Sequence, residues 1–230
     1  LPFPSEYFLG EAETPSGYRV HFWPESLPEN RDDVRIAPDR FNENDGFSTM
    51  GSMLTWFEDV SIDGVIGHQD LDAYLEPGAK TVILDAETGE RVPHFVELDQ
   101  TAEKDDERLL MLRPVVPLDF GTRYVVGIRG LQTNAGGEVA VSHAFEALRD
   151  DLETNNWDIE GRRDHFEEEV FPVLEADGFD RSELQLAWDF VTISRENSLG
   201  RAEWCRDDAL EAMGPGGPEY RITKETPGDC

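Results

Sequence analysis

The sequence predicts a mainly β protein with helical insertions, built on a β-sandwich. Three features of its 230 residues support this fold class. Short apolar runs, separated by turns that contain Gly or Pro, recur between residues 52 and 144, as is typical of sandwich strands. Apolar residues then recur at helical spacing over about 145–178. Strand alternation returns at 184–190, so we expect a closing strand after a helical insertion.

Residues 1–51 are expected to form an extended, Pro-rich arm that docks on the body of the chain. Six prolines in this stretch exclude a long helix. Five large aromatic side chains could pin the arm to the body or contact a partner protein, and these are Phe3, Tyr7, Phe8, Phe22 and Trp23. The alternative is a disordered segment, but the aromatic content favours docking.

The sandwich is expected to occupy residues 52–194, including the helical insertion. Its predicted strands cover residues 54–57, 81–85, 92–98, 108–113, 123–129 and 139–141. We expect the second and third of these strands to form one hairpin, because a Gly-containing turn at 87–90 joins them. We expect the fourth and fifth to pair around a turn at 117–121.

The insertion shows two apolar faces at helical spacing. The first comprises Phe145, Leu148 and Leu152, and the second comprises Phe166, Val170, Val173 and Leu174. Pro172 should kink or divide the second helix because it lacks an N–H group. The charged residues before it, including Asp164 and His165, are expected to form a solvated helix face.

In the closing strand, alternation places Trp188 and Phe190 on one face and Asp189 on the other. We expect the two aromatic side chains to pack in the core. Asp189 should then pair with an Arg side chain or a backbone N–H, because a buried carboxylate needs a partner.

Residues 195–230 are expected to form a helix, a Gly/Pro hinge and a short C-terminal strand. Ser194 can cap a helix from about Arg195 to Met213. The hinge covers 214–218 and the strand covers 219–225. Two cysteines, Cys205 and Cys230, read as one disulfide in an exported chain, with two free thiols as the alternative.

The net charge of −30 excludes whole classes of partner. Binding to nucleic acid needs clustered Lys and Arg, and anionic lipid head groups would repel this surface. No apolar stretch is long enough to span a membrane. Self-repulsion at this charge calls for screening by salt, so we expect an extracytoplasmic protein, periplasmic, surface-located or secreted, in a saline environment. The alternative is an acidic surface that only maintains solubility.

The sequence carries no recognisable catalytic set, and we expect no enzymatic activity. An esterase nucleophile needs a G-x-S-x-G turn with His and Asp partners, and this motif is absent. The best candidate metal ligands are Asn42, Asn44 and Asp45, whose hard oxygen atoms suit Ca²⁺. Further carboxylates could come from Asp32, Asp33, Asp39 and Asp63. Because Asn-Asp-Gly is also a common turn sequence, we favour a structural turn there. No other cofactor is expected.

Several segments also resemble a known family. They are Leu1–Phe8, Asn42–Ser48, Arg91–Asp99, Arg113–Leu118, Arg123–Val126 and Leu186–Phe190. Together they resemble the N-terminal, Ig-like region of large exported bacterial proteins related to lipases and esterases, in which an α/β-hydrolase-like half follows. The resemblance implies an Ig-like β-sandwich, export from a bacterial cell and a non-catalytic place in the parent protein. No position here matches the hydrolase residues.

Three functions follow from these observations. The first is a non-catalytic interaction module or structural subunit that binds a protein partner or joins a larger assembly. The second is a substrate-positioning or regulatory part of a secreted lipase-like hydrolase. The third is a Ca²⁺-dependent binding domain.

Overall fold

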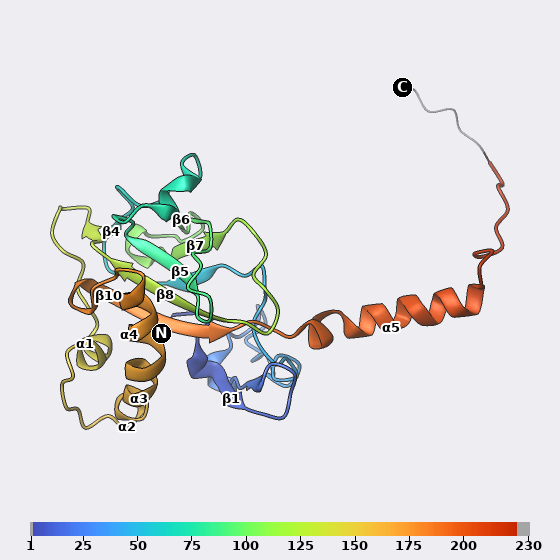
Figure 1. Cartoon of the computed structure of the whole chain (residues 1–230), viewed down its shortest axis with the longest axis horizontal. Helices are drawn as coiled ribbons and strands as arrows, with labels where there is room; N and C mark the ends of the chain where they lie inside the picture. The colour runs from blue at the N-terminus through green and yellow to red at the C-terminus, as the bar shows by residue number, and fades with distance from the viewer. Residues whose placement is uncertain (1, 225–230) are drawn as a thin grey trace. The chain divides into compact units, whose positions relative to one another are not determined.

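The computed structural model describes residues 2–224 and divides the chain into two compact units, Leu1–Ser194 and Arg195–Cys230. The first unit is a mixed α/β structure with several small antiparallel sheets and a group of short helices (Figure 1). Within the described residues, these sheets do not close into a barrel. The second unit contains one long helix, α5 (Arg195–Met213).

Two three-stranded antiparallel sheets form the centre of the first unit. In order across each sheet, one contains β3 (Met53–Thr55), β7 (Leu110–Pro114) and β6 (His94–Leu98), and the other contains β10 (Leu184–Val191), β8 (Arg123–Arg129) and β5 (Thr81–Asp85). Apolar side chains from both sheets share one core, which includes Leu112, Ile83, Val126 and Trp188. The alternation predicted for β10 is therefore confirmed.

The predicted strand pairing is wrong. We expected β5 to form a hairpin with β6, but β5 pairs with β8, and only a single bridge between Leu84 and Arg91 joins the two segments across their turn. We also expected β7 to pair with β8, but the two strands lie in different sheets. Both turns carry the chain from one sheet to the other. The pattern of apolar residues cannot distinguish these cases, because it marks the buried face and not the neighbouring strand.

A layer of helices covers the outer face of the β10–β8–β5 sheet. It consists of α1 (His143–Arg149), α2 (Trp157–Glu160), α3 (Arg163–His165), a π-helical turn (Phe166–Val170) and α4 (Phe171–Ala176). Figure 1 shows α1, α3 and α4 gathered beside β10 and β8. A second apolar core joins them to the sheet through Phe145, Leu174, Val125 and Ala187. Helix α1 ends before Leu152, which is exposed rather than on the predicted apolar face.

Two local features set the position of α4. Pro172 lies in its first turn, directly after the π-helical turn, so the predicted interruption falls at this proline. On the sheet side, a Cβ atom at Gly127 would lie 2.7 Å from Leu174 Cδ2. A larger residue at this position would therefore require the buried side chain of Leu174 to shift.

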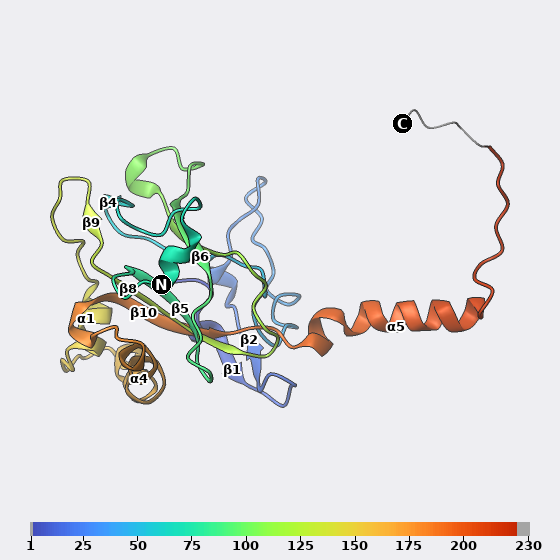
Figure 2. The same cartoon turned by 45° about the horizontal axis from the view of Figure 1, so that its top comes forward.

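Parts of the segment 2–50 are held against this body, and the segment contains some regular structure. The strands β1 (Leu9–Glu11) and β2 (Tyr18–Val20) form a hairpin, which Figure 2 shows apart from the other sheets. Phe3 and Leu54 exchange backbone hydrogen bonds of 2.8 and 2.6 Å. Trp188 Nε1 donates to the carbonyl of Pro4 at 2.8 Å, which ties the N-terminal segment to β10.

The remaining elements are small. A two-residue ladder joins β4 (Val60–Ser61) to β9 (Gln132–Thr133), and short 3-10 helices cover Glu6–Phe8, Pro24–Ser26, Leu71–Leu75, Asp105–Glu107 and Arg181–Glu183. The predicted strand at 139–141 does not form, and Val139 instead fills the core beside Leu131.

In the second unit, α5 begins and ends at the predicted residues. The strand expected at 219–225 is not formed over 219–224, and residue 225 lies outside the described residues. None of the helices in the described part of the chain is long and apolar enough to cross a membrane.

Candidate functional site

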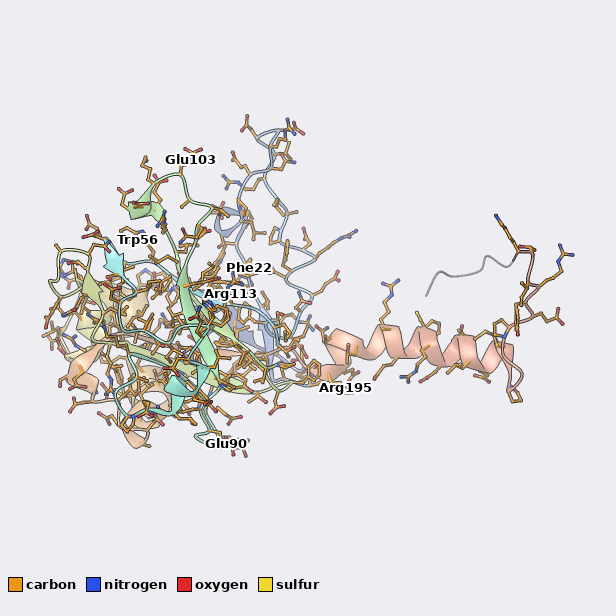
Figure 3. All side chains as sticks on the ribbon, turned by 90° about the horizontal axis from the view of Figure 1, so that it is seen from above. Phe22, Trp56, Glu90, Glu103, Arg113 and Arg195 are labelled. Carbon is orange, nitrogen blue, oxygen red and sulfur yellow. The ribbon has the colours of Figure 1, made fainter. Side chains whose placement is uncertain are left out.

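Most of the aromatic side chains between residues 2 and 50 form one connected cluster, which includes Phe3, Phe8, Phe22 and Phe47. The rings of Phe8 and Phe22 lie 5.2 Å apart, and Phe3 lies 6.2 Å from Phe22 and 5.5 Å from Phe47. Phe8 and Phe22 also pack against the core between the sheets. They therefore hold this segment on the body, as aromatic pairs with centroids 4.5–7 Å apart are expected to do. Figure 3 labels Phe22 within this region.

The cluster continues outward to rings that are far more exposed. Tyr7 lies 5.6 Å from Trp23, and Phe22 lies 6.3 Å from Phe41. Phe3, Trp23 and Phe41 expose 39%, 41% and 43% of their surface. We call these three side chains the aromatic surface. Of the five aromatic residues predicted to dock or to bind a partner, the structure thus brings all into one cluster and leaves Phe3 and Trp23 accessible. Partner binding by them stays a prediction.

The predicted calcium ligands hold the backbone of neighbouring segments. Asn42 accepts a hydrogen bond from the N–H of Phe22 at 2.8 Å and donates to its carbonyl at 3.0 Å. Asn44 donates to the carbonyl of Phe41 at 3.0 Å. Asp45 is buried and accepts from the N–H of Ser194 at 2.9 Å. These contacts give the three residues a structural role, and calcium binding by them stays a prediction.

A second group of polar residues gathers around Asp189 in the middle of β10. Its side chain is only 1% exposed, and its Oδ1 atom lies 2.9 Å from His165 Nε2. Among the described residues Oδ2 has no hydrogen-bond partner, and Arg123 Nη1 lies 3.6 Å from it. We expected Asp189 to pair with an arginine or a backbone N–H. An arginine does lie near it, so the expectation is correct in part, but His165 is the closer partner.

Three different segments supply this cluster. Asp189 comes from the sheet, His165 from the end of α3, and Glu6 from the 3-10 helix that Ser5 caps by accepting from the N–H of Tyr7. One carboxylate oxygen from each acid and one imidazole nitrogen lie within 4.8 Å of one another. We call Glu6, His165 and Asp189 the three-residue cluster. It is the one group of three or more His, Cys, Asp or Glu side chains so arranged in the described part of the chain.

Two neighbouring arginines offset part of the negative charge of this cluster. Arg162 Nη2 lies 3.3 Å from Glu6 Oε2, while Arg123 forms an ion pair with Glu169 through its other terminal nitrogen. Burial acts to lower the pKa of His165, but the hydrogen bond and charge of Asp189, with a contribution from Glu6, raise it above its usual value. The carboxylates of Asp189 and Glu6 therefore favour the protonated form of this imidazole.

Sequence reasoning missed this cluster because it placed His165 on a solvated helix face, which is incorrect. The histidine is partly buried, with its side chain 27% exposed. One signal was available: Asp189 is a charged residue inside an otherwise apolar strand, which requires a buried partner. The sequence could not show which of the distant polar residues folds against it.

One hollow in the described part of the chain has a volume of about 780 Å³ and is lined by polar and charged side chains, which include Lys80, Arg129 and Arg149. Its cations are already used by the protein itself. Lys80 donates to the carbonyl of Asp63 at 2.9 Å, and Arg129 donates to those of Pro77 and Gly178 at 2.6 and 3.0 Å. These side chains therefore hold neighbouring loops together.

The last predicted site is the disulfide. Cys205 is exposed on α5, and its predicted partner, Cys230, lies outside the described residues. The pairing stays a prediction. Comparison of the chain with models of protein families and with curated proteins finds no match to any of them.

Proposed function

We propose that this chain is a non-catalytic, extracytoplasmic module that binds another protein through its aromatic surface. The observation that carries the proposal is the contrast within one cluster of rings. Phe8 and Phe22 anchor the segment to the core, whereas Phe3, Trp23 and Phe41 each leave more than a third of their surface in water. Phe3, Trp23 and Phe41 are joined to one another through Phe8 and Phe22, and exposed aromatic side chains on such an anchored support are typical of a binding hot spot.

The charge around this surface indicates the chemistry of the partner. Residues 1–51 contain ten acidic and four basic residues, and the whole chain carries −30. A second copy of the chain would be repelled by this charge. The better occupant is a protein face with apolar side chains surrounded by Lys and Arg, because complementary charge speeds association and disfavours other partners.

The finer fold and the family resemblance are part of the same proposal. Two antiparallel sheets with a common core support a β-sandwich, and we assign it to the Ig-like type. Such a module has a natural place beside the catalytic half of an exported lipase-like protein. An experimentally determined structure with Greek-key strand connections would support the Ig-like assignment.

A second candidate is the substrate-positioning or regulatory part of such a hydrolase. The observation that favours it is α5, which buries none of its side chains and leaves Trp204 66% exposed. A following domain could cover this helix. Sequencing the gene beyond the codon for Cys230 tests this candidate, since a downstream G-x-S-x-G motif favours it and a stop codon opposes it.

The test of the proposed function uses single substitutions on the aromatic surface. Trp23→Ser and Phe41→Ser remove exposed rings without opening the core, and Trp157→Ser is the matched control because Trp157 is exposed on α2, outside the cluster. Cross-linking in cells of the source organism, followed by mass spectrometry, identifies the partner. Titration of the purified pair by calorimetry then measures the affinity of each variant.

We expect the cross-linked partner to carry a basic, apolar face. We expect each of the two test substitutions to weaken binding by about tenfold or more, with the control unchanged. Equal binding by all variants, or a loss with Trp157→Ser alone, contradicts the proposal. So does a wild-type protein that forms no cross-link except to its own copies.

A further inference from the structure

The geometry points to a binding site for one divalent transition-metal ion, with Zn²⁺ as the best fit, formed by Glu6, His165 and Asp189. This site is independent of the aromatic surface. It would join the N-terminal segment, the helical layer and β10 through a single ion.

The donor set selects the class of metal. One imidazole nitrogen and two carboxylates are ligands that Zn²⁺ accepts, with three protein ligands and water in the fourth position. Ca²⁺ instead takes six to eight oxygen ligands, and the nitrogen of His165 does not suit it. In a tetrahedral zinc site, bond lengths of about 2.0–2.1 Å place neighbouring donors about 3.3 Å apart. The donors of the three-residue cluster lie within 4.8 Å, and His165 Nε2 is 2.9 Å from Asp189 Oδ1.

Asp189 supplies an independent reason to expect a ligand. Its carboxylate is buried, yet Oδ2 has no hydrogen bond. A buried, incompletely paired carboxylate oxygen costs free energy, and a metal ion would satisfy it. The alternative partner is Arg123, which lies 3.6 Å away, too far for a hydrogen bond, and which is already paired with Glu169.

The site also offers access and a suitable charge. The side chains of Glu6 and His165 are 30% and 27% exposed, so an ion can enter from solvent between them. The ion pair of Glu6 with Arg162 has a distance of 3.3 Å and is partly exposed, which makes it weak and easy to exchange. With the imidazole neutral, as a metal ligand must be, the carboxylates of Glu6, Asp189 and Glu169 outnumber the two guanidinium groups of Arg123 and Arg162, so a cation meets net negative charge.

The test measures zinc binding by the full chain after treatment with a chelator. Calorimetry with Zn²⁺ in excess Mg²⁺ removes diffuse binding to the acidic surface, because Mg²⁺ competes for carboxylates but poorly for imidazole. Cobalt(II) substituted for zinc then reports coordination through its visible absorption. We expect one Mg²⁺-resistant site per chain, the absorption of four-coordinate cobalt, and a melting temperature that rises with added Zn²⁺.

Two conservative variants and one control locate the ion. Glu6→Gln and His165→Gln retain hydrogen-bonding groups at partly exposed positions, so both should fold, as circular dichroism would verify. His143→Gln is the control, since His143 is fully exposed and lies 3.5 Å from an acid, Glu146, outside the cluster.

We expect each cluster variant to bind zinc about tenfold more weakly or worse and to lose the cobalt absorption. The control should behave as the wild type. The inference is overturned if the wild type binds zinc only weakly and without saturation in Mg²⁺. It is equally overturned if the zinc affinity of both cluster variants is undiminished.

Discussion

His94 should make the stability of this fold depend on pH between about 6.5 and 4. The side chain lies at the start of β6 and is 1% exposed. Its Nδ1 atom is 2.9 Å from the carbonyl of Val92, and its Nε2 atom is 2.9 Å from Thr81 Oγ1. Because a carbonyl only accepts, Nδ1 carries the hydrogen. In the neutral imidazole, Nε2 then has no hydrogen and accepts from the threonine hydroxyl.

Burial lowers the pKa of His94 to about 4, and the charge of Arg91 acts in the same direction, although the hydrogen bond to Val92 partly opposes them. The unfolded chain binds its proton near pH 6.5, before the folded chain does. The stability of the folded state is thus complete above pH 6.5 and declines as the pH falls toward 4. The difference of about 2.5 pH units corresponds to a loss of about 3 kcal/mol.

Urea denaturation, followed by tryptophan fluorescence at constant ionic strength, measures this loss at several pH values. His94→Gln removes the titrating group, so the variant should be less stable at neutral pH but should lose less stability on acidification. His143→Gln, at an exposed position, should retain the slope of the wild type. Equal slopes for the wild type and His94→Gln would refute the reasoning, as would an ordinary pKa for His94 in an NMR titration.

Three further predictions concern charge, packing and covalent structure. Raising NaCl to about 1 M, where the Debye length is roughly 3 Å, should raise the melting temperature because it screens the charge of −30; a flat or falling melting temperature contradicts this. Gly127→Ala should lower the free energy of unfolding by about 1–3 kcal/mol, because the new methyl group would lie 2.7 Å from Leu174 Cδ2. Gly10→Ala is the control: its methyl group meets nothing within 4 Å, so it should lower that free energy by less than about 1 kcal/mol. Urea denaturation measures both. We expect Cys205 and Cys230 to form a disulfide that closes a loop of about 25 residues and contributes about 3 kcal/mol; alkylation of both thiols before reduction, seen by intact-mass measurement, would exclude it.

The parts of the fold that could be predicted depend on local pattern. The alternation of Trp188, Asp189 and Phe190 gave the strand β10 and its core-facing side chains, and helical spacing placed Phe166 and Leu174 on one buried face. The pairing of strands could not be predicted in this way. Segment 81–85 is buried on both faces, so its pattern carries no information about its neighbour.

The candidate sites differ in the same respect. The aromatic residues of the first segment were visible because they are close in sequence and unusual in a Pro-rich stretch. The three-residue cluster joins Glu6, His165 and Asp189, which are far apart in sequence. Asp189 stood out as a charged residue in an apolar strand, but nothing in the segments of Glu6 and His165 marked them as its partners, and only the packing of three segments around one buried carboxylate brings their donors together.

The contacts that hold the N-terminal segment limit the order in which this fold can form. Trp188 binds the carbonyl of Pro4 across 184 residues, and Ser194 binds the side chain of Asp45 across 149. Phe47 exchanges backbone hydrogen bonds of 2.9 and 2.7 Å with Val191 and Ile193. A ribosome makes the first segment long before these contacts exist. The rings of that segment can take their places against the core only after β10 has been made, and contacts so distant in sequence favour slow folding.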